Sequence, residues 1–85
     1  MYSVEFTKAA SKTLGTVPGD LRQLVLRKIE AVAGDPHGAH NNVTRMVGRS
    51  EFRLRVHDWR AIYRVQDDRV VLLVIKIGTR GQVYL

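Results

Sequence analysis

The 85-residue sequence predicts an α+β fold of the order β-α-α-β-β-β, in which a two-helix hairpin packs on one face of an antiparallel sheet. Three observations predict it: an apolar–polar alternation near the N-terminus, two segments with helical spacing of apolar residues, and strand patterns in the second half. With 45% hydrophobic and 26% charged residues, the chain is long enough for one modest core. We therefore expect residues 1–85 to form a single domain.

The first part of the chain predicts one strand and two helices. Apolar and polar residues alternate over 2–6, which is the period of a half-buried strand. Thr7 is placed to cap a short helix. After a break at Pro18, Asp20 is placed to cap a second helix, which the sequence Gly-Asp-Pro at 34–36 ends. The apolar face of this second helix consists of Leu21, Leu24, Val25, Ile29 and Val32.

Strand patterns dominate from residue 43 onward. They cover residues 43–47, 52–56, 59–65 and 70–77. The last of these is apolar at both parities, which is typical of a central strand covered on two sides. The ending GTRGQVYL, residues 78–85, predicts one more short β-like piece after a glycine-marked bend.

The segment EFRLRVHDWRAIYRV, residues 51–65, predicts a hairpin with one apolar and one basic face. A turn at 56–59 gives these apolar pairs: Val56 with Trp59, Leu54 with Ala61, and Phe52 with Tyr63. The other face then carries Arg55 opposite Arg60, Arg53 opposite Ile62, and Arg64 beside Glu51. We expect the last strand to continue this face with Val71, Leu73, Ile75 and Ile77.

The basic face of the hairpin indicates an anionic ligand. Like charges directly opposite one another destabilise a sheet, and outward arginines of an edge hairpin can also serve only to prevent aggregation. Arginine in place of lysine favours phosphate, because a guanidinium binds it bidentately and stacks on bases. The net charge of +6 and the pI of about 10.3 agree with a polyanionic partner, whether nucleic acid, an acidic protein or an anionic surface.

Composition also excludes several classes of protein. The chain has no cysteine, which excludes disulfides and thiolate metal sites. No apolar run approaches the roughly 18 residues of a membrane span, and the N-terminus lacks the pattern of a signal peptide. We therefore expect a cytoplasmic protein without a membrane partner. His37 and His40 lie in a loop without a third matched ligand, so the sequence predicts no metal site.

The runs RMVGRSEFRLRVHDWRAIYRV and VLLVIKIGTRGQVY resemble the RelE/ParE superfamily of bacterial type II toxin–antitoxin toxins, in its RelE-like branch. Together with the order of elements, the resemblance covers essentially the whole chain. It implies a toxin that enters the ribosomal A site and cleaves messenger RNA without metal or cofactor, which inhibits translation. It also implies a cognate antitoxin encoded alongside and a higher-order toxin–antitoxin complex.

The resemblance carries over five residues of a candidate catalytic site: Arg53, Arg55, Arg60, Arg80 and Tyr84. The implied reaction is attack of a ribose 2′-hydroxyl on the neighbouring phosphorus with expulsion of the 5′-oxygen. The arginines would clamp the phosphate and stabilise the leaving oxygen, and Tyr84 would stack on or orient a base. RelE-type hairpins often carry lysines where this chain has Arg53 and Arg55, and arginine is a poor proton acceptor. His57 and Glu51 are therefore the candidate proton acceptors.

Two alternative functions remain open at the level of sequence. ParE-type members of the superfamily inhibit DNA gyrase and lack the nuclease residues. A non-catalytic basic module that binds nucleic acid or the antitoxin is the other alternative, and salt-sensitive RNA binding without cleavage would identify it. By their parity, Trp59 and Tyr63 are expected to be core residues and not platforms for bases.

Overall fold

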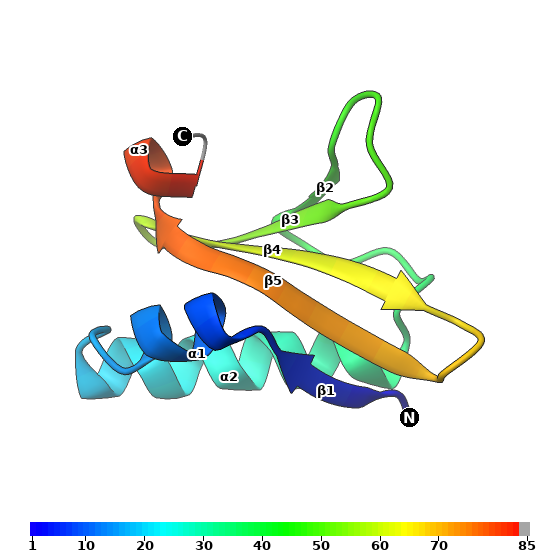
Figure 1. Ribbon diagram of the computed structural model, residues 1–85, viewed down its shortest axis with the longest axis horizontal. Coiled ribbons are helices and arrows are strands. Elements are labelled where there is room, and N and C mark those ends of the chain that lie inside the picture. The colour runs from blue at the N-terminus through cyan, green and yellow to red at the C-terminus, as the bar shows by residue number, and fades with distance from the viewer. Residues whose placement is uncertain (84–85) are drawn as a thin grey trace.

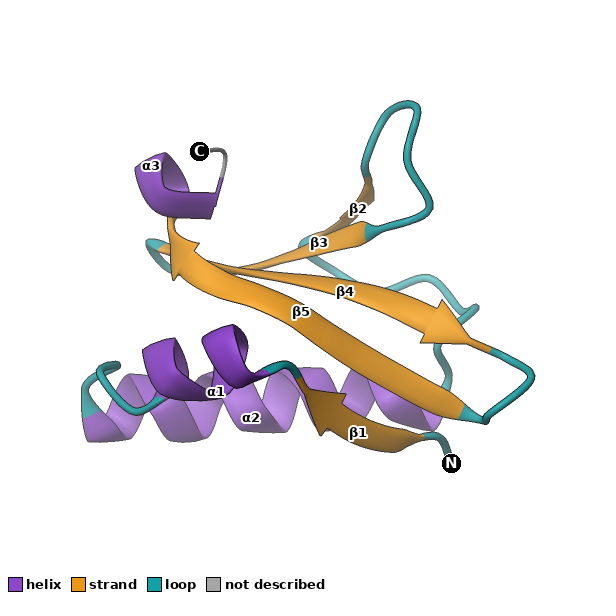
Figure 2. Cartoon of the chain, viewed as in Figure 1, coloured by secondary structure: helices purple, strands orange, loops and turns teal. Residues whose placement is uncertain are grey.

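The computed structural model describes residues 1–83 and has the predicted α+β class (Figure 1). Its elements are β1 (Ser3–Phe6), α1 (Lys8–Leu14), α2 (Gly19–Gly34), β2 (Val43–Arg45), β3 (Phe52–Val56), β4 (Trp59–Gln66), β5 (Val71–Thr79) and α3 (Arg80–Val83). The order of the described elements is β-α-α-β-β-β-β-α, which has one strand and one short helix more than the predicted β-α-α-β-β-β. Helices α1 and α2 lie together along one face of the twisted sheet (Figure 2). The short α3 follows the end of β5 on the side of the sheet away from them. None of the described helices is long and apolar enough to cross a membrane.

The sheet has the strand order β1-β5-β4-β3-β2. Strands β2 to β5 form an antiparallel meander, and the predicted hairpin register between β3 and β4 is confirmed at each of its five pairs. Strand β1, however, pairs with β5 in parallel, from Ser3 opposite Val71 to Phe6 opposite Val74. Side-chain alternation carries no information about strand direction, which explains why an entirely antiparallel sheet was expected.

The core lies between the two helices and the sheet. The helices and the strands each contribute a set of buried residues to it: Ala10, Val25, Ile29, Val32 and Ala33 from the helices, and Leu54, Val56, Ala61, Tyr63, Leu72, Val74 and Ile77 from the strands. Tyr63 is 2% exposed, burial raises its pKa to about 12, and its ring stacks on Phe52. Trp59 is partly buried against the same cluster. The expected core roles of Tyr63 and Trp59 are thus confirmed.

The ends of the helices agree with the sequence except at one cap. The Thr7 hydroxyl accepts a hydrogen bond from the backbone N–H of Ala10 at 3.1 Å, as expected for an N-cap. The expectation for Asp20 is wrong: α2 begins at Gly19, and Pro18 is its N-cap without a side-chain hydrogen bond. Proline already holds a φ close to the helical value, so it can precede the first turn. Asp20 lies inside that turn, where its charge favours the helix dipole.

A β-bulge changes the expected outer face of β5. Ile62 pairs with Lys76 and the next residue, Tyr63, pairs with Val74, so Ile75 is the extra residue. Beyond the bulge the parity is reversed. Ile77 is therefore 3% exposed and belongs to the core, and the expectation that it would share the arginine face is wrong. Parity arguments fail past a bulge because each extra residue turns all later side chains to the other face.

The C-terminal expectation of another β-like piece is also wrong, since residues 80–83 form α3. The backbone N–H of Thr79 donates a hydrogen bond to the Gln82 side-chain oxygen at 2.9 Å, which fixes the first turn. Gly78 allows this turn to pack on β5: a Cβ at Gly78 would lie 3.0 Å from Cβ of Gln82 and 3.2 Å from Cγ1 of Val83. A larger residue at 78 would displace α3.

Val70, in the turn between β4 and β5, has a φ of 53°, which is strained for a β-branched residue. It is 48% exposed, so its side chain contributes little to the core. We expect Val70→Gly to raise the free energy of unfolding by about 1 kcal/mol, because relief of strain exceeds the added chain entropy of glycine. Urea denaturation measures this. Val47→Gly, at a 98% exposed position without a positive φ, is the control and should give no gain. Equal effects at both positions would contradict the strain argument.

Candidate functional site

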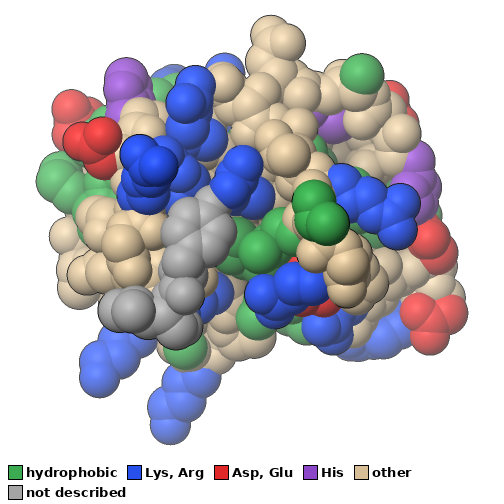
Figure 3. Space-filling model, turned by 90° about the horizontal axis from the view of Figure 1, so that it is seen from above, with side chains coloured by type: hydrophobic (Ala, Val, Ile, Leu, Met, Phe, Trp, Pro, Cys, Tyr) green, Lys and Arg blue, Asp and Glu red, His purple; other side chains and the backbone are tan. Residues whose placement is uncertain are grey.

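Four of the predicted site residues line one hollow on the face of the sheet opposite α1 and α2. The hollow has a volume of about 650 Å³ and is lined by Asn42, Thr44, Arg53, Arg55, Arg60 and Arg80; we call it the arginine hollow. Figure 3, which views this face, shows cationic side chains gathered in groups around apolar ones. The predicted grouping of Arg53, Arg55 and Arg60 with Arg80 therefore arises from three elements, β3, β4 and α3.

The strand register brings these arginines together. Arg55 and Arg60 are direct cross-strand partners, and Arg53 lies two residues before Arg55 on the same face of β3. Arg80 begins α3, directly after β5. On β5 the residue opposite Arg60 is Gly78, whose missing side chain allows the turn of α3 to approach. Glycine at 78 therefore helps to place Arg80 beside the hairpin arginines.

Backbone and amide oxygens hold two of the guanidinium groups. Arg60 donates from Nη1 to the carbonyl oxygens of His57 at 3.1 Å and Trp59 at 3.3 Å. Arg55 donates from Nη2 to the Asn42 side-chain oxygen at 3.5 Å, and the Arg55 backbone N–H donates to the Asn42 backbone carbonyl at 2.9 Å. Neutral partners orient these cations without neutralising them. The charge therefore remains available to an anion.

The lining of the arginine hollow contains four guanidinium groups and, among the described residues, no carboxylate. Such a set binds the oxygens of a phosphate bidentately and stabilises negative charge that develops on them. Asn42 and Thr44 also line the hollow, and the sequence reasoning missed both. For Thr44 the one available signal was its pairing with Arg53 across β2 and β3, which places both side chains on the same face. For Asn42 the sequence pattern gave no signal, because the position depends on a left-handed backbone with a φ of 65°.

His57 and Glu51, the candidate proton acceptors, do not line the arginine hollow. His57 is exposed in the β3–β4 turn and lines a neighbouring hollow of about 430 Å³, with Leu24 and Lys28 of α2 on the other side. Of the described residues, only Arg55 and Asn42 are common to the two hollows. Tyr84, the fifth predicted site residue, lies outside the described residues.

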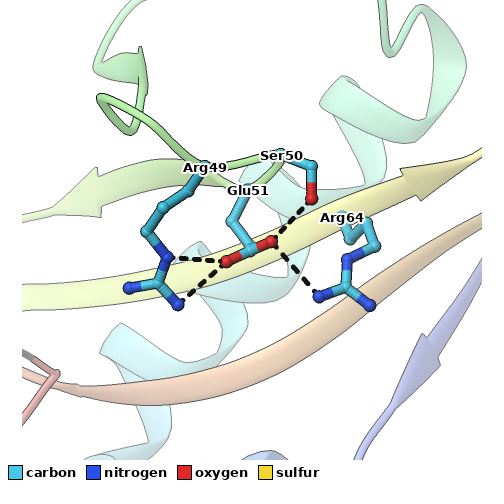
Figure 4. A network of polar contacts seen from close by, with 4 residues as sticks. All are labelled: Arg49, Ser50, Glu51 and Arg64. Atoms are coloured by element: carbon cyan, nitrogen blue, oxygen red, sulfur yellow. Dashed lines mark hydrogen bonds and ion pairs between the residues drawn. The ribbon is translucent and has the colours of Figure 1, made fainter.

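Glu51 is buried and holds two arginines (Figure 4). Its Oε1 accepts a hydrogen bond from Nε of Arg49 at 2.9 Å and forms an ion pair with Nη2 of the same residue, also at 2.9 Å. Its Oε2 accepts hydrogen bonds from the Ser50 hydroxyl at 2.8 Å and from Nη2 of Arg64 at 3.2 Å. Hydrogen bonds from Ser50 and Arg64 and the charge of Arg49 lower the pKa of Glu51. A carboxylate with both oxygens occupied and a lowered pKa is a poor proton acceptor, so the geometry favours a positioning role.

Glu51 makes stability depend on pH in a defined direction. Its pKa is lowered from the ordinary 4.5 in the folded chain, so its contribution is present above that value and is lost as pH falls through the folded pKa. We expect Glu51→Gln to reduce the loss of stability on acidification, measured by urea denaturation at several pH values below 5. Hydrogen bonds from Tyr2 and His37 lower the pKa of Asp67 in the folded chain, so Asp67 still contributes to the loss of stability on acidification in the variant. If the free energy of unfolding fell with pH in the variant just as it does in the wild type, the role of Glu51 would be contradicted.

Among residues 1–83, no group of three or more His, Asp or Glu side chains is placed to hold a metal ion. The cationic lining of the arginine hollow also disfavours a metal cation, because it would repel one. The site, as described, is built to bind an anion.

Comparison with known proteins places the chain in a family. Residues 4–84 match the model described as the ParE toxin of the type II toxin–antitoxin system, parDE. The chain belongs to this toxin family. It is 28% identical over 79 residues to the mRNA interferase toxin RelE of Escherichia coli K12, which covers 93% of this chain and 83% of that protein.

Solved structures of RelE toxins share the fold. The toxin in the archaeal RelE–RelB complex of Pyrococcus horikoshii is similar to 95% of this chain and 97% of its own length, with a TM-score of 0.80 and 25% identity. For the intact E. coli RelBE toxin–antitoxin complex the TM-score is 0.81 at 23% identity, over 93% of this chain and 96% of that one. The superfamily resemblance and the fold class predicted from the sequence are thus confirmed.

Proposed function

We propose that this chain is a ribosome-dependent endoribonuclease that cleaves messenger RNA and so inhibits translation. One observation carries the proposal: Arg53, Arg55, Arg60 and Arg80, from three separate elements, line a single hollow to which residues 1–83 contribute no acidic side chain. The relative named an mRNA interferase supports the same activity at 28% identity. The toxin would act in the cytoplasm, where messages are translated.

In the proposed reaction the ribose 2′-oxygen forms a bond to the adjacent phosphorus while the bond from phosphorus to the 5′-oxygen breaks. The products are a 2′,3′-cyclic phosphate and a free 5′-hydroxyl. Arg53, Arg55 and Arg60 would hold the phosphoryl oxygens, whose negative charge increases in the transition state. Arg80 would stabilise the leaving 5′-oxygen.

Proton transfer in this proposal does not use the two acceptors predicted from the sequence. Glu51 is committed to Arg49 and Arg64, and His57 lines a different hollow. The guanidinium groups keep their protons, because arginine has a pKa above about 12. Water would therefore accept the 2′-hydroxyl proton, and water would also supply the proton that the leaving 5′-oxygen takes up. The arginine cluster would promote both transfers by stabilising the alkoxide and phosphoryl charges.

The partner in this proposal is a cognate antitoxin. The structures of the E. coli and P. horikoshii relatives are complexes of RelE with RelB, which supports an antitoxin for this chain as well. Acidic residues of such a partner would neutralise the arginine hollow, and co-purification with the protein encoded next to the toxin tests this pairing.

Gyrase inhibition remains the second candidate, because the matching family model is that of a ParE toxin. A cell-free translation reaction with purified protein, in which message ends are mapped by primer extension, separates the two functions. Discrete cuts that depend on translation support the nuclease. Intact messages together with inhibition of gyrase in a supercoiling assay would overturn it in favour of the second candidate.

A further inference from the structure

A second, smaller hollow lies on the same face of the sheet as the arginine hollow. It has a volume of about 250 Å³ and is lined by Met46, Arg49, Glu51, Ile62, Arg64, Ile75, Lys76 and Val83. Drug-sized ligands occupy pockets of roughly 300–1,000 Å³, so a hollow of this size suits a single ring system. We call it the flanking hollow.

The flanking hollow combines an apolar floor with a cationic rim. Ile62, Ile75 and Val83 form the apolar part, and Ile62 is only 5% exposed. Among the residues that the structure describes, the rim carries three cations and one carboxylate, a net charge of +2: Arg49, Arg64, Lys76 and Glu51. Apolar groups bordered by guanidinium planes are a surface on which a nucleobase stacks while its phosphate binds the cations.

The rim arginines are held in place before any ligand binds. Arg49 and Arg64 approach the Glu51 carboxylate from opposite sides (Figure 4). Arg64 is 45% exposed and Arg49 is 59% exposed, so both remain accessible from solvent. A guanidinium has five N–H donors, and Glu51 engages two nitrogens of Arg49, one by a hydrogen bond and one by an ion pair, and one nitrogen of Arg64. Glu51 thus positions two cations whose remaining donors can reach a phosphate.

The flanking hollow adjoins the arginine hollow along β4. Arg60, Ile62 and Arg64 alternate on one face of this strand, at steps of about 7 Å. Ile62, on the floor of the flanking hollow, is the direct partner of Arg53 in the arginine hollow. A step of this size is similar to the distance between successive phosphates of a single strand. A strand with one phosphate in the arginine hollow therefore brings its next nucleotide to Ile62 and Arg64.

We propose that the flanking hollow binds the nucleotide next to the scissile phosphate, with its base on Ile62 and Ile75 and its phosphate at Arg64 and Arg49. This inference rests on the proposed nuclease function and names a substrate subsite for it. Charge complementarity and continuity with the arginine hollow select a nucleotide of the message as the occupant. The other possible occupant is an acidic segment of the antitoxin, and the test below distinguishes the two.

The test uses ribosomes programmed with synthetic messages that carry one abasic ribonucleotide, on either side of the cleaved bond. Removal of the base that occupies the flanking hollow should slow single-turnover cleavage by the wild type by about five- to 150-fold, and removal of the base on the other side should not. Ile75→Thr should slow cleavage of the intact message, and base removal should then have little further effect. This coupling between side chain and base is the signature of direct contact.

A binding measurement accompanies the cleavage assay. Fluorescence anisotropy of a message with a 2′-deoxy block at the cleavage position reports affinity at several salt concentrations. Loss of one phosphate contact in Arg64→Ala should reduce the slope of log affinity against log salt by about 0.7. Arg27→Ala is the control. It removes the same charge at an exposed position of α2, on the opposite side of the sheet, and should leave the slope unchanged. Arg64→Lys and thermal melting of each variant check that the fold is retained.

The possible failures are distinguishable. If the wild type cleaves the message, but Ile75→Thr and Arg64→Ala behave as the wild type with intact and abasic messages, the subsite is wrong and the nuclease function stands. If these variants only weaken neutralisation by the antitoxin, the hollow belongs to the antitoxin and the subsite is again wrong. If the wild type leaves every message intact while binding still depends on Arg64 and on the flanking base, the nuclease function is wrong and the nucleotide site stands.

Discussion

Replacement of both Arg60 and Arg80 by alanine should lower the rate of message cleavage by at least about a thousandfold. Both side chains line the arginine hollow, where they would stabilise the phosphoryl charge and the leaving oxygen. Removal of one such preorganised donor typically costs about 10²–10³ in rate. The two losses need not multiply, because both residues act on one phosphate. The measurement is single-turnover cleavage of a programmed message, with ends mapped by primer extension.

The controls for this prediction distinguish loss of the site from a general loss of positive charge and from a disturbed fold. Arg27→Ala removes a positive charge at an exposed position of α2, and this variant should cleave as the wild type does. Arg60→Ala also removes hydrogen bonds to the carbonyl groups of His57 and Trp59, so Arg60→Lys with a melting curve is needed to exclude a disturbed turn. A double variant that is folded and cleaves within about tenfold of the wild type would overturn the phosphate clamp.

The largest effect on stability is expected for Leu72→Ala. Leu72 is fully buried in β5, between the helices and the sheet, and it pairs with Val65 on β4 and Val4 on β1. Truncation should lower the free energy of unfolding by about 2–5 kcal/mol, because it removes apolar contacts and leaves a cavity. That is a large share of the 5–15 kcal/mol typical of a small domain. Urea denaturation at neutral pH measures the change.

The neighbouring Leu73→Ala is the matched control, since it makes the same chemical change on the other face of the strand. Leu73 is half-buried and pairs with Arg64 on the outer face. We expect a clearly smaller loss than for Leu72→Ala, because less apolar area is uncovered. Equal losses would mean that the outer face of β5 is as tightly packed as the core.

Much of the fold follows from local patterns in the sequence. The alternation over residues 51–65 determined which side chains lie on each face of the β3–β4 hairpin, and the register of all five pairs agrees with it. The capping role of Thr7 and the end of α2 at Gly34 also follow from local chemistry. These features depend on residues close together in the chain, which is why the sequence predicts them.

Features that depend on distant residues required the tertiary structure. The bulge at Ile75 directs the Ile77 side chain into the core and places Lys76 opposite Ile62. The sequence could not predict this, because no local pattern marks an extra residue in an apolar strand. The parallel pairing of β1 with β5 likewise depends on the path of the chain.

The candidate site divides in the same way. The sequence by itself determined that Arg53, Arg55 and Arg60 share a face, because hairpin parity is local. Only the tertiary structure decided that Arg80 joins them, that His57 lines another hollow, and that Glu51 is occupied by Arg49 and Arg64. These outcomes depend on how β5, α3 and the loop before β3 pack on the hairpin, and packing between distant segments is set by the whole core.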